Sequence, residues 1–408
     1  MESAKIKIAL AVTLAEQGGV QQFMAGFASW LVAQGHDVTV IAGDGMNRMV
    51  HTDGSWLETR CEERGIPFIR LRKLGREINP LRDPLAVLEL RDVLRDLKPD
   101  AVELNSTKMS VIGSIATRLL GYSATRLPRV VYRIGGWSFR EALPAHKLWL
   151  YRSLEKWTGK LKDVIICVNP DDVRLANEIG IRARENVIAV PNGIDLPRFD
   201  AALLPRDPAR TRLSEAIHYS LLTTHFLFGT TANFFPPKDL PRYMEACKIV
   251  HDAESNARFV ILGDGLQRAE IETRRRELGL DEVVLLPGAR DDATTLLTGF
   301  DAFVLPSSKE GMSFSLLEAM AARLPCIATD VGAATWMFTR QNAQLSAGDD
   351  EGGVIVPKMN PPALAEAMLR VMRDATLRER LANEARRQIE TRFPLQKTYE
   401  GNLKALTG

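Results

Sequence analysis

Short runs of β-branched and other apolar residues alternate along the first half of the chain with longer segments in which apolar residues recur at helical spacing. The apolar runs cover residues 5–12, 37–42, 67–71, 101–105, 129–134, 163–168 and 186–190. Such runs predict buried strands, and a segment of helical period between two of them predicts the crossover helix of a βαβ unit. We therefore expect a parallel sheet with helices on both faces.

The alternation stops at a polar stretch and then begins again. This stretch contains proline and arginine and extends from Pro191-Asn192-Gly193-Ile194-Asp195 to about residue 220. New apolar runs follow at 226–229, 258–262, 283–286, 302–305, 326–329 and 354–356, and helical periods follow at 361–374 and 376–391. The predicted fold class is α/β, with two Rossmann-like domains that face one another across a cleft.

The polar stretch also sets the domain boundary. The predicted domains are residues 1–191 and 192–390, and a C-terminal helix at 391–408 could cross back to the N-terminal domain. Ligands of open α/β sheets bind beyond the carboxyl ends of the strands. The chemistry is therefore expected in the loops that follow strands.

Composition narrows the class of protein. The 408 residues are 45% hydrophobic and 25% charged, which excludes a disordered or fibrous chain. No apolar run approaches the ~18 residues that a membrane helix needs, so a soluble cytoplasmic protein is expected. Four cysteines lie far apart and never as Cys-x-x-Cys, which favours reduced core residues over a zinc site or a disulfide framework: Cys61, Cys167, Cys247 and Cys326.

Charge is unevenly distributed. Residues 1–190 carry 27 basic and 22 acidic side chains, a net charge of +5, and the remainder carries 26 and 29, a net charge of −3. Between Arg64 and Arg140 the net charge is +8, from 15 basic and 7 acidic side chains. A basic half is compatible with nucleic acid, a membrane surface or an anionic small molecule, and equally with solvated surface charge.

The densest group of polar candidates follows the predicted strand at 302–305. Ser313 is a plausible N-cap, and a helix is expected from Phe314 to Arg323. Free N–H groups at the start of that helix would favour an anion such as a diphosphate. Glu310 and Glu318 are unsuited to glycoside hydrolysis, because eight residues of helix would separate them by about 12 Å. Instead, each could accept hydrogen bonds from a different part of one elongated ligand.

The spacing of Glu310 and Glu318 resembles the hallmark of the family 4 retaining glycosyltransferases of the GT-B fold. Further matching segments follow in family order along nearly the whole chain: Gly18-Gly19, Gly35-His36-Asp37-Val38-Thr39-Val40, Pro191-Asn192-Gly193-Ile194-Asp195, Leu262-Gly263-Asp264-Gly265 and Thr329-Asp330-Val331-Gly332. The stretch Gly135-Gly136-Trp137-Ser138-Phe139 directs the resemblance towards bacterial cell-surface polysaccharide enzymes.

The resemblance implies a role for each candidate residue. Glu318 would bind the ribose of a nucleotide sugar, Glu310 would contact the donor sugar, and Lys238 would lie on the diphosphate, which makes Glu310 and Lys238 the catalytic candidates. The remaining donor-binding candidates in the C-terminal domain are Gly311, Met312, Ser313, Phe314, Asn233 and Gly263. The N-terminal domain would hold the acceptor, with Gly18, Gly19 and Gly136 in loops that contact acceptor or phosphate.

Three positions depart from the family pattern. Asn233 stands where an arginine is usual, Gly135 stands where a histidine often precedes Gly-Trp, and Ala333-Ala334-Thr335-Trp336 replaces Gly-x-Pro-Glu. Arg133 and Arg140 are candidates to supply the missing charge. No Asp-x-Asp occurs, and Lys238 with the helix-start amides could neutralise the leaving group, so neither a metal nor another cofactor is expected.

The predicted function is transfer of a sugar from a nucleoside diphosphate sugar, UDP being favoured, to a lipid-linked or other glycan acceptor, with no nucleic-acid partner. Two alternatives remain: a weak or inactive nucleotide-sugar-binding protein on the same fold, and, with less support, a nucleotide-sugar epimerase. Peripheral contact with the anionic inner membrane face is a further expectation. It rests on the apolar series Leu150, Leu154, Trp157 and Leu161, with Trp149 and Tyr151, among basic residues, although such a series also suits packing on its own sheet.

Overall fold

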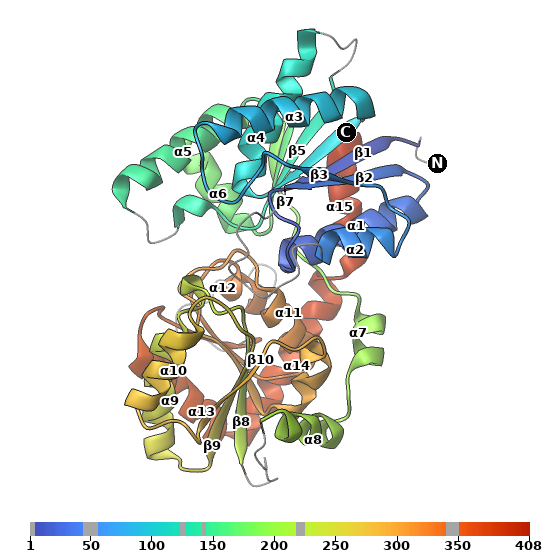
Figure 1. Cartoon of the computed structure of the whole chain (residues 1–408). Helices are drawn as coiled ribbons and strands as arrows, with labels where there is room; N and C mark the ends of the chain where they lie inside the picture. Colours follow the sequence, from blue (N-terminus) through green and yellow to red (C-terminus); the bar gives the residue numbers. More distant parts are fainter. Residues whose placement is uncertain (1–4, 44–55, 123–126, 141–143, 218–224, 340–350) are drawn as a thin grey trace. The chain divides into compact units, whose positions relative to one another are not determined.

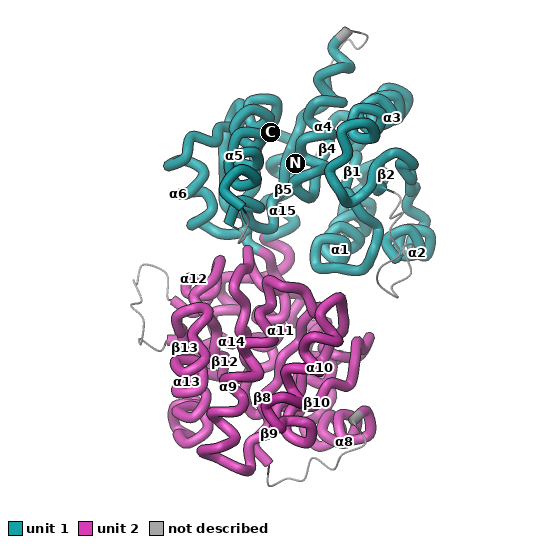
Figure 2. The backbone as a smooth tube through the Cα atoms, turned by 60° about the vertical axis from the view of Figure 1, so that its left-hand side comes forward, with its two compact units in different colours: residues 1–191, 398–408 teal, residues 192–397 magenta. Residues whose placement is uncertain are grey.

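The computed structural model describes residues 5–43, 56–122, 127–140, 144–217, 225–339 and 351–408. The chain divides into two compact units (Figure 2). Unit 1 comprises residues 1–191 and 398–408, and unit 2 comprises residues 192–397.

Unit 1 contains a sheet of seven parallel strands in the order β3-β2-β1-β4-β5-β6-β7. Every strand lies within two residues of the apolar run that predicted it. The strands are β1 Lys7–Val12, β2 Asp37–Gly43, β3 Phe68–Leu71, β4 Ala101–Asn105, β5 Arg129–Ile134, β6 Val164–Cys167 and β7 Asn186–Ala189.

Helices cover both faces of this sheet, as the continuous apolar runs require. Figure 1 shows α3, α4 and α5 over one face and α1, α2 and α15 over the other. The helices of unit 1 are α1 Gly19–Ala33, α2 Trp56–Glu62, α3 Arg82–Leu97, α4 Thr107–Leu119, α5 Ala145–Gly159 and α6 Pro170–Ile179, with the 3-10 turns Leu120–Tyr122 and Ser138–Arg140.

The last helix, α15 Leu395–Thr407, passes from unit 2 into unit 1, because the boundary between the units lies at Lys397 and Thr398. Tyr399 stacks among the aromatic rings of α1, at 5.3 Å from Phe27 and 5.5 Å from Trp30. A side chain at Gly26 would meet the Tyr399 hydroxyl at 2.4 Å, so this glycine lets α15 lie close to α1.

Unit 2 contains a sheet of six parallel strands in the order β10-β9-β8-β11-β12-β13. The strands are β8 Phe226–Thr231, β9 Ala257–Leu262, β10 Val284–Gly288, β11 Ala302–Leu305, β12 Cys326–Thr329 and β13 Val354–Val356. The helices after them are α9 Leu240–Ala253, α10 Arg268–Glu277, α11 Phe314–Ala321, α12 Ala334–Phe338, α13 Pro361–Arg373 and α14 Ala375–Arg392, with 3-10 segments η3 Pro236–Lys238 and η4 Ala293–Gly299.

Two helices occupy the polar stretch in which no element was expected, α7 Leu196–Ala202 and α8 Arg206–Ile217. Of the apolar side chains of α8, Ala209 and Leu213 are buried. The helix is also attached by polar contacts, because Arg210 donates to the Gly299 carbonyl at 3.0 Å and to Asp301 at 2.5 Å. Because polar contacts contribute to its attachment, α8 lacks the strong apolar periodicity by which a helix is predicted from sequence.

The strand order identifies where each sheet can bind a ligand. In unit 2 the winding direction reverses between β8 and β11, and in unit 1 it reverses between β1 and β4. Loops that leave the carboxyl ends of two such strands diverge to opposite faces and open a crevice. The segment with Lys238 follows β8 and the segment with Glu310 follows β11, so the main candidates of unit 2 lie at its reversal point.

The four cysteines are buried and free, as predicted. Among the described helices none is long and apolar enough to cross a membrane.

Candidate functional site

The two loops at the reversal point of unit 2 are joined through one backbone carbonyl. Pro237, in the turn after β8, accepts hydrogen bonds from the Ser308 N–H at 2.8 Å and from the Ser308 hydroxyl at 3.2 Å. Ser308 follows β11. The loop after β11 is thereby held against the loop that carries Lys238.

Lys238 and Glu310 form an ion pair between these loops. The Lys238 Nζ lies 2.6 Å from Glu310 Oε1, and the buried Ser307 hydroxyl donates to the same oxygen at 2.8 Å. The Lys238 and Glu310 side chains are 22% and 14% exposed, so both remain accessible to a ligand. The sequence predicted a shared ligand for these two residues, and the structure brings them into direct contact.

The turn at Gly332 packs against the backbone of the Glu310 loop. Gly332 follows β12 with φ +53°, and a Cβ there would lie 2.3 Å from the Gly311 carbonyl oxygen. The next residue, Ala333, donates its N–H to that oxygen at 2.7 Å. A side chain at Gly332 would therefore displace the backbone on which Glu310 lies.

Asn192 holds the same loop at Met312. The Asn192 amide donates to the Met312 carbonyl at 3.1 Å, and its backbone N–H approaches the Met312 sulfur at 3.2 Å. Both residues are buried. The Pro191-Asn192-Gly193 segment, 120 positions earlier in the chain, thus holds the loop between Glu310 and Glu318 in place.

The helix after this loop begins where the sequence predicted and ends two residues earlier. Ser313 is the N-cap of α11, and its hydroxyl accepts the N–H of Leu316 at 3.3 Å. N–H groups in the first turn of a helix point towards its N-terminus and favour an anion there. Gly311, Met312, Ser313 and Phe314 form the approach to this end.

Glu318 lies in α11, one turn further along. Burial raises the pKa of its carboxyl to about 7, and a hydrogen bond from the Thr294 hydroxyl opposes the rise. Hydrogen bonds donated by a ligand, such as those of a diol, would favour the charged form of this carboxyl.

Gly263 packs against the segment that precedes Lys238. It has φ +148°, and a Cβ there would lie 1.8 Å from the Ala232 carbonyl oxygen. In the same turn the Asp264 carbonyl accepts the Phe234 N–H at 2.8 Å. Asn233 is exposed between these contacts, so Asn233 and Gly263 lie at the carboxyl ends of the neighbouring strands β8 and β9.

Three predicted residues belong to unit 1. Gly18 is the N-cap of α1 and Gly19 its first residue, both after β1, and Gly136 follows β5. Gly136 has φ +141°, a conformation that favours glycine, whereas Gly18 is in an extended conformation open to any residue. The adjacent Trp137 is a core residue, and its ring N–H donates to the Asp172 carbonyl at 3.0 Å.

The two arginines considered as substitutes for a missing charge are engaged within unit 1. Arg133 is buried, with its guanidinium 3.7 Å from the Phe23 ring centroid and its charge opposite Glu103. Burial lowers the pKa of Arg133 to about 10 and raises that of Glu103 to about 7. Arg140 donates to the buried Asp172 at 3.0 Å.

Ser307, Thr294 and the Pro237 carbonyl are additions that the sequence reasoning missed. Pro237 precedes Lys238, and Ser307 lies in the loop of Glu310. The sequence around a loop serine or a proline carbonyl does not show which group it will hydrogen-bond. Thr294 belongs to η4, which carries no motif. Its proximity to Glu318 arises only when the chain is folded.

Two family models match the chain, one in each half. The model described as Glycosyl transferase 4-like domain matches residues 18–193, and the model described as Glycosyl transferases group 1 matches residues 219–388.

Individual relatives agree with these matches. The chain is 30% identical over 261 residues to an Escherichia coli UDP-Gal:alpha-D-GlcNAc-diphosphoundecaprenol alpha-1,3-galactosyltransferase. The aligned residues are 63% of this chain and 65% of that protein. It is 24% identical over 358 residues to the Staphylococcus aureus capsular polysaccharide biosynthesis glycosyltransferase CapM, covering 86% of this chain and 87% of that protein. Anabaena HepE, in complex with UDP and glucose, has the same fold, with a TM-score of 0.77 at 17% identity over 99% of this chain and 100% of HepE.

Proposed function

Because the chain belongs to the group 1 glycosyltransferases, we propose that it transfers a sugar from a UDP-sugar to a hydroxyl of a lipid-linked acceptor, with retention of configuration, in cell-surface polysaccharide assembly. The Lys238–Glu310 pair at the reversal point of unit 2 carries this proposal. It places a cation and a hydrogen-bond acceptor side by side, next to the start of α11. A sugar diphosphate requires both kinds of group.

The choice of UDP and of a lipid-linked acceptor is supported by relatives. The Escherichia coli enzyme uses UDP-Gal and a diphosphoundecaprenol-linked acceptor, as its name states, and HepE binds UDP. In this chain the ribose diol would donate to Glu318, and the diphosphate would lie between the N-terminus of α11 and Lys238. The partial positive charge of the helix N-terminus and the ammonium of Lys238 would stabilise the charge that develops on the departing diphosphate without a metal ion.

Glu310 would orient the donor sugar. Its carboxylate is already fixed by Ser307 and Lys238, so little side-chain freedom is lost when a sugar hydroxyl binds. No side chain is placed as a covalent nucleophile. We favour attack by the acceptor hydroxyl from the face that the diphosphate leaves, with a phosphate oxygen accepting the proton.

One observation favours a second reading, a nucleotide-sugar-binding protein with little turnover. Asn233 is exposed at the end of β8, where the resemblance places an arginine. Incubation with each common nucleotide sugar and an acceptor extract, followed by measurement of released nucleoside diphosphate, distinguishes the readings. The transferase releases UDP from at least one UDP-sugar, whereas binding without release from any donor would contradict transfer.

The raised pKa of Glu318 predicts a pH-dependent donor affinity. Donor binding favours the charged carboxylate, so affinity should rise with pH and level off above the pKa of about 7. Between pH 6 and 8 the Kd for UDP-glucose should fall about tenfold, as expected for one proton lost on binding. UDP-glucose is a suitable calorimetric probe because its diphosphate does not titrate near neutrality. Glu318→Gln should remove this slope, and an identical slope in that variant would assign the titration to another group.

We further propose that unit 1 binds to an anionic membrane surface, which would bring a lipid-linked acceptor within reach. On α5 the side chains of Trp149 and Trp157 are 70% and 56% exposed, and Leu150 is exposed beside them. The helix instead buries Glu155, which accepts a hydrogen bond at 3.2 Å from Lys162 in the segment after the helix. The apolar series predicted from the sequence is therefore only partly packed on the sheet.

A second exposed apolar stripe lies on α3. Leu81, Leu85 and Leu88 recur at helical spacing, and Leu81 is 81% exposed. Helices α3 and α5 both pack on α4, so the two stripes belong to the same face of unit 1. Exposed basic residues of α5 accompany them: Lys147, Arg152 and Lys156. Aromatic and apolar groups among cations suit an anionic lipid interface.

The protein should therefore sediment with anionic liposomes at low salt and much less with neutral ones. The double variant Trp149→Ser/Trp157→Ser should reduce sedimentation several-fold, because it removes the apolar contact and leaves the charges in place. Leu266→Ser, which changes a 54% exposed side chain of unit 2, is the matched control and should sediment like the unaltered protein. Equal, negligible sedimentation with both kinds of liposome would favour a soluble acceptor.

A further inference from the structure

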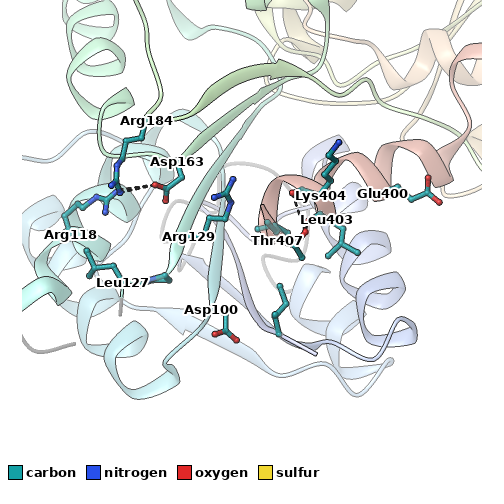
Figure 3. A pocket seen from close by; sticks show the side chains of 13 residues that line it. Asp100, Arg118, Leu127, Arg129, Asp163, Arg184, Glu400, Leu403, Lys404 and Thr407 are labelled. Carbon is teal, nitrogen blue, oxygen red and sulfur yellow. Dashed lines mark hydrogen bonds and ion pairs between the residues drawn. The ribbon is translucent and has the colours of Figure 1, made fainter. Parts of the chain in front are cut away.

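A separate pocket lies in unit 1, at the edge of the sheet opposite to the carboxyl ends of its strands. It has a volume of about 860 Å³ (Figure 3). Asp100 precedes β4, Arg129 begins β5, Asp163 precedes β6 and Arg184 lies before β7, and all four line it. Helix α15 forms the opposite wall. The glycine loops of unit 1 leave the other edge of this sheet, so the pocket is separate from them.

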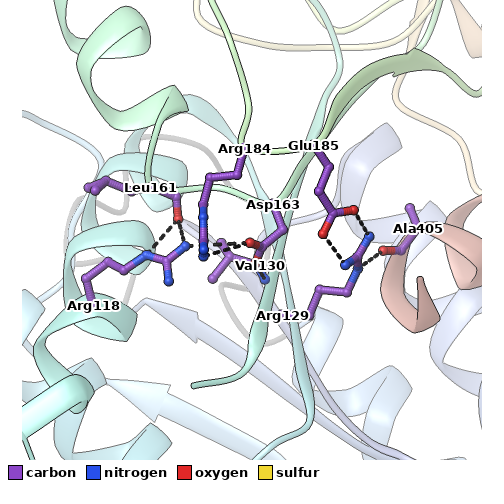
Figure 4. Close-up of polar contacts among 8 residues, drawn as sticks. All are labelled: Arg118, Arg129, Val130, Leu161, Asp163, Arg184, Glu185 and Ala405. Atoms are coloured by element: carbon purple, nitrogen blue, oxygen red, sulfur yellow. Dashed lines mark hydrogen bonds and ion pairs between the residues drawn. The ribbon is translucent and has the colours of Figure 1, made fainter. Parts of the chain in front are cut away.

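Positive charge exceeds negative charge on the wall formed by Arg118 and Arg184. Arg184 lies 3.0 Å from Asp163 Oδ1, and Arg118 lies 3.7 Å from the same atom (Figure 4). The other oxygen of Asp163 accepts the Val130 N–H at 2.8 Å. One carboxylate therefore serves two guanidinium groups and a backbone amide. The net charge of this cluster is positive.

Arg118 is held in place before any ligand binds. Its Nε and Nη2 donate to the Leu161 carbonyl at 3.1 and 2.8 Å (Figure 4). Burial lowers the pKa of Arg118, Asp163 raises it, and the neighbouring Arg184 lowers it further. An anion placed between the two guanidinium groups would relieve their repulsion and accept paired hydrogen bonds.

Helix α15 adds a cation of its own. Lys404 is exposed on the pocket wall, and its ammonium forms no ion pair within the described part of the chain. In contrast, Arg129 is already neutralised by Glu185, with contacts of 2.6 and 2.5 Å, and it donates to the Ala405 carbonyl of α15 at 2.7 Å.

Asp163 lies on the Arg118 wall, whereas the other two acidic lining residues do not. Asp100 accepts the Lys7 N–H at 2.9 Å, and Figure 3 shows Asp100 and Glu400 away from Arg118 and Arg184. Apolar side chains form the remaining surface: Ile6, Leu127, Pro128, Leu403 and Leu406.

We propose that this pocket binds a small phosphorylated compound with an apolar or planar body. The phosphate would contact Arg118 and Arg184, and the body would lie on the leucine and proline side chains. The volume falls within the range of small-molecule sites. The lining residues of α15 lie in the part of the helix that belongs to unit 1. This proposal is independent of the sugar-transfer reaction.

Calorimetry of the full chain with phenyl phosphate and with inorganic phosphate tests this proposal. Phenyl phosphate should bind with a stoichiometry of one and about tenfold more tightly than inorganic phosphate, because its ring leaves water. Arg184→Ala should weaken phenyl phosphate binding about tenfold, the cost of one charge-assisted contact. The Arg184 side chain is exposed, so this variant does not disturb the core.

Two controls locate the site. Arg174→Ala removes an exposed arginine on α6 and should bind phenyl phosphate like the unaltered protein. Lys238→Ala, in the loops of unit 2, should also bind it unchanged. The proposal is overturned if phenyl phosphate fails to bind at millimolar concentration, or if Arg184→Ala binds it normally. Loss of binding in Lys238→Ala alone would place the probe in unit 2 and would likewise overturn it.

Discussion

Replacing Lys238 by alanine is expected to lower kcat about a hundredfold or more, the usual cost of removing one preorganised group that stabilises developing charge. The donor KM should rise far less, because the cation matters most when the diphosphate departs. In the free protein the same ammonium lies 2.6 Å from Glu310, so the variant also leaves that carboxylate without its cation. Steady-state release of UDP measures both constants.

A charge-matched control separates this effect from a change in net charge. Lys358 is an exposed lysine of the same unit, and Lys358→Ala should leave kcat unchanged. EDTA should not slow the unaltered enzyme, since in the proposed mechanism Lys238 and the α11 amides would neutralise the leaving group. A rise in KM with normal kcat in Lys238→Ala, or a strict need for added Mg²⁺ or Mn²⁺, would contradict this role.

Replacing Glu318 by alanine is expected to weaken UDP binding ten- to a hundredfold. A carboxylate that accepts both ribose hydroxyls makes two charge-assisted hydrogen bonds, each worth about 1.5–3 kcal/mol, and part of that gain is offset by the energy needed to ionise a half-buried carboxyl. Titration calorimetry with UDP at pH 8, above the pKa of about 7, measures the effect where the carboxylate is charged.

The control for Glu318 is an exposed glutamate on another helix of unit 2. Glu366→Ala on α13 should bind UDP like the unaltered protein. Glu318→Gln keeps one acceptor oxygen and should fall between the unaltered protein and the alanine variant. Unchanged UDP affinity in Glu318→Ala would remove this residue from the donor site.

The strands were predictable because both sheets are parallel and buried on both faces. A strand such as Val164–Cys167 has all four residues buried, and it stands out from amphipathic neighbours by its continuous apolar run. Helix α8 was missed for the opposite reason, because Arg210 holds it by polar contacts that leave no apolar period. On α5, the buried Glu155 shows that a charged residue can lie on the packed face when a buried partner satisfies it, here Lys162 from the segment after the helix.

The local shape of the site was also partly predictable. The N-cap Ser313 and the helix after it follow from capping chemistry within a few residues. The contact between Lys238 and Glu310 spans 72 positions and depends on β8 and β11 being neighbours, which no local pattern encodes. The Pro237 carbonyl escaped notice for the same reason, since its partner Ser308 lies on the other loop.

Product configuration tests the central claim most directly. The enzyme would be supplied with a lipid-linked acceptor and the UDP-hexose that gives the fastest UDP release, and the new glycosidic bond would be examined by NMR spectroscopy. Retention predicts that the sugar, α-linked in the donor, is also α-linked in the product, with one UDP released for each bond formed. In Lys238→Ala, product formation should be slowed about a hundredfold or more. A β-linked product, or a product formed at the normal rate by Lys238→Ala, would contradict the proposed donor site.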